Sequence, residues 1–521
     1  MSLVLPMSRI LFILSGLITT IAFFNQREIH VLLSLTLSLA VLIYLSDKVR
    51  YESKFTMKIP ILLNAVIISY SVTSNLHRSA IGHWLTPWVA LPAVTYFLFH
   101  YLAWFYLGFA KGIFLHVKNS INVTHQMKWF FGIGASLLLF TLFAINRLTP
   151  VFFAPSQSHL ASQLPHEYLF FDVLFQTDTN PLFVFDHVFM LDVPSSRQPL
   201  FSLFSFPLVA PLYGLSRLLF FIPNLYPTLL MWLQFLLAFA TGVLLYIMVR
   251  KSLSHPKLFF AFYLSTYVMM VFPLILERFI FGLFYLVVLI YSYWANREER
   301  HFAIIGAMGT NLLSLAMGGF LIMIHERLWG KLALKLGGLF LAFVVVFGRL
   351  PLFFYGGTLE DSTRWLTLEV GLWHQLMQFS HFIWGSFLFP ATAVHFYIYP
   401  RYEQAIVSGF HLGGLLIVVV SLLTAIRYRN VFFVRVAAFW FGISFVLLGL
   451  LGWSAQQHNL ILFASFFSFG VVYLFYLFLE QALAKFQHRS KILGGLVSLL
   501  IVYNIFGLWD LLAFALRYYH W

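Results

Sequence analysis

Long apolar runs recur throughout this chain, and they limit its fold more than any other feature. About thirteen of them are long enough to cross the hydrocarbon core of a bilayer as α-helices. Hydrophobic residues make up 61% of the 521 positions and charged residues only 10%, and the mean hydropathy is +0.87. Because backbone polar groups must be satisfied internally in lipid, the sequence predicts an all-α polytopic membrane protein. The predicted spans are 10–24, 30–45, 59–75, 89–109, 129–145, 226–249, 258–276, 279–295, 334–350, 406–426, 431–452, 459–480 and 492–509.

Lysine and arginine residues gather in short clusters between these runs. They total 32, against 18 acidic residues, for a formal net charge of +14. Such a charge also occurs in nucleic-acid-binding proteins, but here the clusters lie at the ends of apolar runs, as in cytoplasmic turns of membrane proteins. The sequence therefore predicts a multi-pass plasma (cell) membrane protein with a cytoplasmic N-terminus and no nucleic-acid partner. Cysteine is absent, which excludes disulfides, thiolate metal sites and cysteine nucleophiles.

Two apolar segments do not fit as simple spans. Treating 201–222 as a span would place Arg250 and Lys251 outside, so a helix or broken helix along the outer interface is expected there. The segment 302–324 is rich in glycine, carries Asn311 near its middle and precedes further basic residues. Two half-helices that enter and return, a re-entrant hairpin, would satisfy these features.

The predicted fold has about thirteen transmembrane helices, the re-entrant hairpin, and two large outer loops that contain interfacial helices. It divides the chain into four parts. These are an N-terminal four-helix membrane segment (1–128), a core (129–350) with an acidic outer loop (146–200) and the interfacial helix (201–222), a second outer loop (351–404), and C-terminal transmembrane helices (405–521).

The acidic outer loop is the most unusual stretch. Of the 18 acidic residues, five fall between positions 167 and 192: Glu167, Asp172, Asp178, Asp186 and Asp192. In a functional interpretation, one aspartate accepts a proton from a hydroxyl group or holds a divalent cation, while Arg197 neutralises a phosphate. In the alternative interpretation, these are solvated loop charges and turn caps, as Asp178 would be in Thr-Asp-Thr-Asn.

Five short segments lie between the predicted spans or at their ends. They are Phe175–Thr179 followed by Asp186, the element Arg197–Phe201, the turn Leu276–Phe279, the segment Gly309–Asn311, and His458-Asn459. Together they resemble the GT-C superfamily of polytopic glycosyltransferases, above all bacterial members that use polyprenyl-phosphate sugars. The likeness covers roughly residues 146–480. The chain departs from the family in the four additional spans before the acidic loop and in Gln198, where many relatives have histidine.

The resemblance implies an inverting transfer of a sugar from a polyprenyl-phosphate donor to an acceptor at the outer face. A carboxylate would deprotonate or orient the acceptor hydroxyl, and cationic side chains would stabilise the leaving phosphate. Asp178, set among polar neighbours, is the first candidate for the carboxylate and Asp186 the second. For a cofactor the alternatives are a divalent cation (Mg²⁺ or Mn²⁺) held by these two aspartates, or none. The acceptor is expected to be a glycan, a lipid or a protein.

The candidate phosphate ligands are Arg197, Arg278 and Arg364, and the other cavity candidates are Glu277, His458 and Asn459. Each also has a structural interpretation. Arg278 beside Glu277 would form an ion pair that closes a turn, and His458 would be a helix-end residue. Arg349 is better explained as an interfacial anchor that reaches the headgroups.

Two other functions remain open from the sequence. A transporter or flippase of a lipid-linked or anionic substrate would account for the interrupted segment 302–324. Against it, ionisable residues are nearly absent from span centres and concentrate in the outer loops. A non-catalytic scaffold would leave the clustered aspartates without a purpose.

Overall fold

A computed structural model describes residues 111–120, 132, 198, 200–219, 221–222, 225–274, 278–297, 300–326, 330–334, 337, 371–388, 410–452 and 463–518. The chain divides into two compact units, Met1–Ser120 with Asp186–Val193, and Ile121–Phe185 with Pro194–Trp521. The helix described in the first unit is α6 (Lys111–Ser120). It lies between the predicted spans 89–109 and 129–145, where a cytoplasmic turn is expected. All other elements below belong to the second unit.

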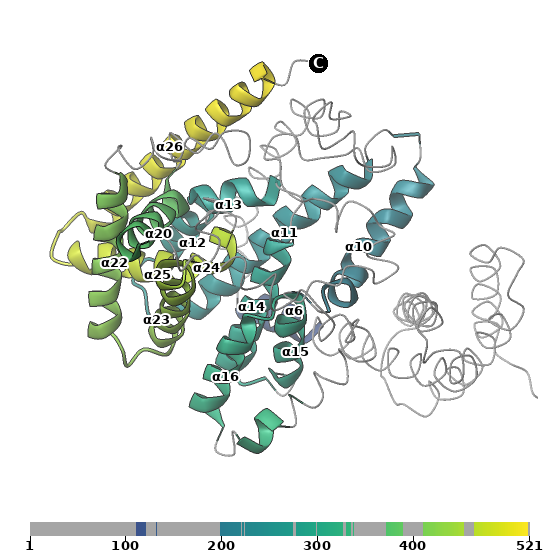
Figure 1. The fold of residues 1–521 in the computed structure, drawn as a ribbon, viewed down its shortest axis with the longest axis horizontal. Coiled ribbons are helices and arrows are strands. Elements are labelled where there is room, and N and C mark those ends of the chain that lie inside the picture. Colours follow the sequence, from purple (N-terminus) through teal and green to yellow (C-terminus); the bar gives the residue numbers. More distant parts are fainter. Residues whose placement is uncertain are drawn as a thin grey trace, which may run out of the picture. The chain divides into compact units, whose positions relative to one another are not determined.

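The described part of the second unit consists of helices and turns and contains no β-strand (Figure 1). Its longer helices are α10 (Phe201–Leu218), α11 (Leu225–Val249), α12 (Pro256–Ser265), α14 (Phe279–Trp294), α15 (Arg300–Thr310), α16 (Ser314–His325), α20 (Leu372–Phe387), α22 (Phe410–Arg427), α23 (Phe432–Ser444), α25 (Phe469–Ala482) and α26 (Arg489–Tyr518). Short elements are α13 (Tyr267–Val271), η5 (Phe272–Leu274), the π-helical turn η6 (Phe445–Leu450) and α24 (Ala464–Phe467).

Three of the described helical segments are long and apolar enough to cross a membrane: Thr228–Val249, Phe432–Leu450 and Arg489–Trp509. Thr228–Val249 and Phe432–Leu450 fall within the predicted spans 226–249 and 431–452, and Arg489–Trp509 begins three residues before the predicted span 492–509. Their length and composition are consistent with the predicted helical membrane protein. The α14 helix, Phe279–Trp294, also follows its predicted span, 279–295, closely. The total of about thirteen spans depends on residues outside the described ones.

The predicted span 258–276 is bent. Its described part is a pair of helical segments, Pro256–Ser265 and Tyr267–Leu274, with an angle of 66° between them. Thr266 has extended backbone angles (φ −61, ψ 144), and its hydroxyl donates a hydrogen bond to the Tyr263 carbonyl oxygen at 2.7 Å. The Thr266 amide donates to the same carbonyl oxygen at 3.2 Å. The helix therefore ends here, because Thr266 leaves the helical conformation and its amide and hydroxyl both cap the last turn.

Helix α20 lies within the predicted second outer loop, and it packs on both α22 and η6. Its side chains Phe379, Phe382 and Ile383 are at most 2% exposed, and Phe379 contacts the rings of Phe441 and Phe445. Gly413 and Gly414 of α22 lie against Trp384 and Ser380 of α20, so closely that an added Cβ would overlap those residues. Small residues allow such close helix packing inside membranes, and Figure 1 shows α20 and α22 side by side.

The segment 302–324 contains two helices, α15 and α16, separated by the turn 311–313. They run back along one another, since Arg300 pairs with Glu326 at 2.7 Å and a Cβ on Gly318 would lie 3.2 Å from Ile304. Helix α16 also packs on α23, where the rings of Phe320 and Phe439 stack with centroids 4.2 Å apart. A helical hairpin is therefore present, and its re-entrant placement in the bilayer stays a prediction.

Helix α10 is continuous through the region predicted as a helix or broken helix, and it ends at Leu218. It contains two prolines that do not interrupt it. Its second half is largely exposed, with Leu218 77% and Leu215 43% accessible. An exposed apolar end suits the predicted interfacial position, which stays a prediction.

Candidate functional site

Four segments far apart in the sequence meet around the first turns of α14. They are the residues that open α10, the start of α14 itself, the tip of the α15–α16 hairpin, and the segment that leads into α24. We call this group the Arg278 cluster. Its members are Gln198, Leu200, Phe201, Phe204, Arg278, Phe279, Gly282, Gly309, Thr310, Asn311, Phe463 and Phe466.

The hairpin tip is joined to the start of α10 by the main chain. The Leu200 amide donates a hydrogen bond to the Gly309 carbonyl oxygen at 2.9 Å. A Cβ on Gly309 would lie 2.8 Å from Leu200 Cβ and 2.8 Å from the ring of Phe204. Only glycine fits this approach without a shift of the neighbours, so residue 309 sets the distance between the two elements.

Arg278 lies over the first aromatic ring of α10. Its Cζ is 5.9 Å from the centroid of the Phe201 ring, within the range of a cation–π interaction. The same ring packs edge-on against Phe281, with centroids 5.6 Å apart. Arg278 is the residue that precedes α14 and its side chain is half-buried. A cation therefore lies next to the start of α10. In the sequence, Gln198 and the predicted ligand Arg197 come shortly before this start.

A second aromatic contact fixes α10 on α14 one turn further along. The Phe204 and Tyr285 rings are edge-on at 5.6 Å, and the Tyr285 hydroxyl donates a hydrogen bond to the Phe204 carbonyl oxygen at 2.9 Å. A buried tyrosine commonly uses its hydroxyl in this way. The position of Phe201 relative to Arg278 is thus supported from both helices.

The other side of the cluster is built on Gly282. A Cβ there would lie 3.5 Å from Asn311 Cβ and 3.6 Å from the Phe466 ring, so the hairpin tip and α24 both contact α14 at this residue. Asn311 is 7% exposed, and its Oδ1 accepts a hydrogen bond from the Leu313 amide at 3.1 Å, which shapes the turn. Phe463 packs edge-on against Phe279 at 5.4 Å, five residues after His458.

Among the predicted site residues, Arg278 is the one that the structure describes. Its neighbours come from the segments that carried the family resemblance: the Arg197–Phe201 element, the Leu276–Phe279 turn and Gly309–Asn311. The remaining predicted residues, Asp178, Asp186, Arg197, Glu277, Arg364, His458 and Asn459, lie outside the described residues. The expected Glu277–Arg278 ion pair is therefore untested.

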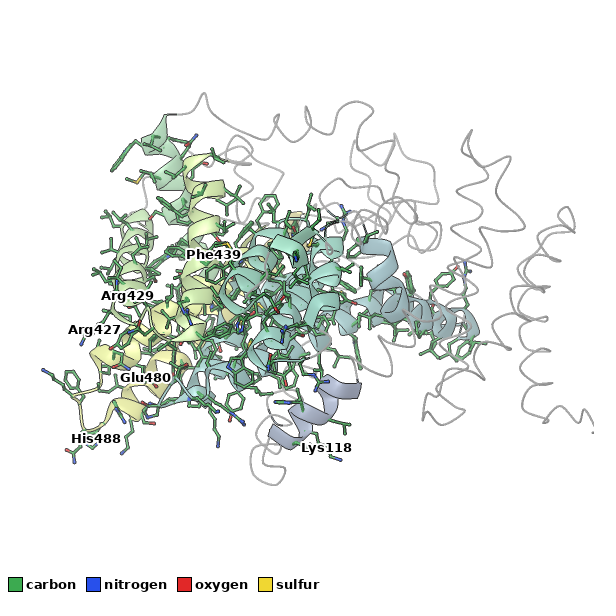
Figure 2. All side chains as sticks on the ribbon, turned by 90° about the horizontal axis from the view of Figure 1, so that it is seen from below. Lys118, Arg427, Arg429, Phe439, Glu480 and His488 are labelled. Carbon is green, nitrogen blue, oxygen red and sulfur yellow. The ribbon has the colours of Figure 1, made fainter. Side chains whose placement is uncertain are left out.

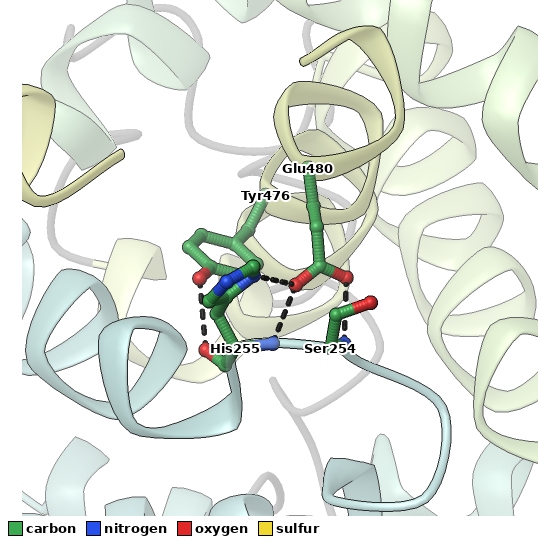
Figure 3. Close-up of polar contacts among 4 residues, drawn as sticks. All are labelled: Ser254, His255, Tyr476 and Glu480. Atoms are coloured by element: carbon green, nitrogen blue, oxygen red, sulfur yellow. Dashed lines mark hydrogen bonds and ion pairs between the residues drawn. The ribbon is translucent and has the colours of Figure 1, made fainter. Parts of the chain in front are cut away.

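A second polar group, which the sequence did not single out, surrounds Glu480 near the end of α25 (Figure 3). This carboxylate is 1% exposed and accepts hydrogen bonds from the Ser254 amide at 3.0 Å and the His255 amide at 2.6 Å. It also contacts His255 Nδ1 at 3.1 Å, while the Tyr476 hydroxyl donates to the His255 carbonyl oxygen at 2.9 Å. Because Pro256 begins α12, the carboxylate sits at the positive end of that helix.

The Glu480 group ties α25 to the turn between α11 and α12, and a structural role accounts for all of its contacts. The only signal for this group in the sequence was a glutamate within an apolar helix. The residues that Glu480 contacts are more than two hundred positions away in the sequence. Neighbouring turns carry exposed basic residues, and Figure 2 shows Arg427 and His488 pointing outward from the helices.

Within the described residues, no group of three or more histidine, aspartate or glutamate side chains could hold a metal ion. The two aspartates predicted as cation ligands lie outside them, so that prediction stays open. Comparison of the chain with protein-family models, with curated proteins and with solved structures finds no match.

Proposed function

We propose that the chain is a membrane glycosyltransferase, which moves a sugar from a polyprenyl-phosphate-linked donor to an acceptor at the outer face of the membrane. The observation that carries the proposal is the half-buried Arg278 over Phe201, at the meeting point of three segments that resemble GT-C enzymes. A guanidinium is suited to a phosphate because its planar N–H groups match two phosphate oxygens. The Phe201 ring supports the guanidinium through a cation–π contact, with Cζ 5.9 Å from the ring centroid.

In the proposed reaction the acceptor hydroxyl oxygen attacks the anomeric carbon of the donor sugar. The hydroxyl proton passes to the Asp178 carboxylate, with Asp186 as the alternative base. The bond between the anomeric carbon and the phosphate oxygen breaks, and its electron pair leaves with the phosphate. Arg278, with Arg197 and Arg364 as the other candidates, stabilises the negative charge that develops there.

The test is an assay of purified wild type, Arg278→Ala and Asp178→Asn in nanodiscs with synthetic polyprenyl-phosphate hexoses, with and without Mg²⁺ or Mn²⁺. Release of polyprenyl phosphate by the wild type is expected, by hydrolysis or by transfer. Arg278→Ala is expected to lower kcat/KM roughly 100-fold, as for loss of one donor that stabilises a transition state. Arg427→Ala changes an exposed arginine at the end of α22; it is the matched control and should retain activity.

A wild type that binds the lipid and never cleaves it would remove the enzyme proposal. If Arg278→Ala and Asp178→Asn both cleaved the donor at the wild-type rate, the roles assigned to these two residues would be wrong.

A transporter or flippase of a lipid-linked or anionic substrate is the second candidate, and one observation favours it. Interrupted membrane helices often form substrate or ion sites, and the α12–α13 pair is bent by 66° at Thr266. Against it, the one buried charged side chain within the described residues is Glu480, and its contacts are all structural. Movement of an intact fluorescent polyprenyl-phosphate hexose across the bilayer of a proteoliposome would favour this candidate over the transferase.

A further inference from the structure

Gln198 brings a buried amide to the Arg278 cluster. The side chain is 6% exposed and its Oε1 has no hydrogen-bond partner within the described residues. The main-chain oxygen of Gln198 accepts a hydrogen bond from the Phe201 amide at 3.2 Å, and the Phe201 ring lies beneath Arg278. Gln198 is therefore one turn from the residue that supports the proposed phosphate ligand.

An amide oxygen that is buried without a partner is costly, because it loses its hydrogen bonds to water and gains none in return. The buried amide of Asn504, by comparison, donates to two main-chain carbonyl oxygens, at 2.7 and 2.8 Å. The hairpin carries a second such atom near its tip, since Ser314 is fully buried and its Oγ also has no partner within the described residues. Unpartnered polar atoms thus occur on both elements that the Leu200–Gly309 hydrogen bond joins.

We infer that Gln198 recognises the sugar of the donor, with Oε1 accepting a hydrogen bond from a sugar hydroxyl while Arg278 binds the phosphate. The inference rests on the proposed function and assigns a separate part of the donor to each residue. A neutral amide suits a neutral hydroxyl group, whereas the phosphate requires a cation. The ligand class is a hydroxyl-bearing hexose linked to a polyprenyl phosphate.

The two roles are separable by measuring binding of two probes, polyprenyl phosphate and polyprenyl-phosphate mannose, to purified protein in nanodiscs. The wild type is expected to bind the sugar form about tenfold more tightly, the effect of one or two well-placed hydrogen bonds. Gln198→Leu should bind polyprenyl phosphate as the wild type does and lose most of the preference for the sugar form. Arg278→Ala should bind both probes weakly.

Thermal unfolding of the same variants without lipid distinguishes sugar recognition by Gln198 from a structural role of this residue. Gln198→Leu removes a buried oxygen that has no partner within the described residues, so its melting temperature should equal or exceed that of the wild type. Gln375→Leu is the matched control, a glutamine 3% exposed on α20 that packs against Gly452. It should leave the preference for the sugar form intact.

Each contrary result has a distinct meaning. If Gln198→Leu keeps the full preference for the sugar form, or melts lower and loses both probes together, the inference is overturned while the transferase proposal stands. If the wild type binds both probes equally, sugar recognition in the cluster is overturned. If the wild type binds neither probe, the proposed function itself fails.

Discussion

The side-chain amide of Asn504 donates a hydrogen bond to the main-chain oxygen of Ser265 at 2.7 Å, across 239 residues of sequence. The acceptor is the last residue of α12, where the chain bends toward α13. The same amide reaches the carbonyl oxygen of Phe387 at the end of α20. One buried side chain on α26 therefore satisfies the ends of two other helices, where carbonyl groups lack partners in the helix itself.

Replacing Asn504 by leucine should destabilise the protein by about 2–3 kcal/mol, because two buried carbonyl oxygens lose their donors. Thermal or denaturant unfolding of the purified protein measures the effect. Asn430→Leu, at an exposed position of the α22–α23 turn, should unfold as the wild type does. Equal stability of the Asn504 variant would show that the bend does not depend on this side chain.

Gly309→Ala should separate the hairpin tip from α10, because the new Cβ would lie 2.8 Å from Leu200 and from Phe204. The expected cost is about 1–3 kcal/mol of stability, as for other overpacked sites, together with a loss of donor binding. Gly319→Ala in the same hairpin is the control, since no atom lies within 4 Å of its added Cβ. It should be neutral or stabilise the hairpin by about 0.5 kcal/mol. Similar melting temperatures for the two variants would contradict the close contact.

Glu480→Ala should destabilise the α11–α12 turn, because the Ser254 and His255 amides lose the buried carboxylate that accepts their hydrogen bonds. A loss of about 2–4 kcal/mol is expected, and limited proteolysis should cut at this turn first. Gln481→Ala changes the next residue, which is exposed, and should behave as the wild type. Unchanged protease resistance of Glu480→Ala would argue against a role in holding the turn.

The absence of cysteine makes the predicted topology directly testable. Arg217→Cys, exposed in the last turn of α10, should react with a membrane-impermeant maleimide added to intact cells. Lys251→Cys, exposed after α11, should react only once the membrane is permeabilised, because the positive-inside pattern places that turn in the cytoplasm. Labelling of both from the same side would contradict the assignment of α10 to the outer interface.

Local apolar pattern was enough to predict several elements. The run 226–249 predicts α11 to within one residue at its start, and 279–295 predicts α14 equally well. Both are uninterrupted apolar stretches bounded by polar turns, so length and hydropathy alone define them. The glycine-rich segment 302–324 was likewise predicted to fold back, and the hairpin α15–α16 is there.

What depended on distant residues could not be predicted in this way. The bend at Thr266 lies inside an apolar run that reads as one span, and it is supported by Asn504 from the other end of the chain. Helix α20 can pack closely against α22 because Gly413 and Gly414 have no side chains at the contact. For the site, the sequence supplied Arg278 as a candidate residue. Only the tertiary structure put Phe201 beneath it and the hairpin tip beside it, because hydrogen bonds and ring contacts between remote segments leave no periodic signal in the sequence.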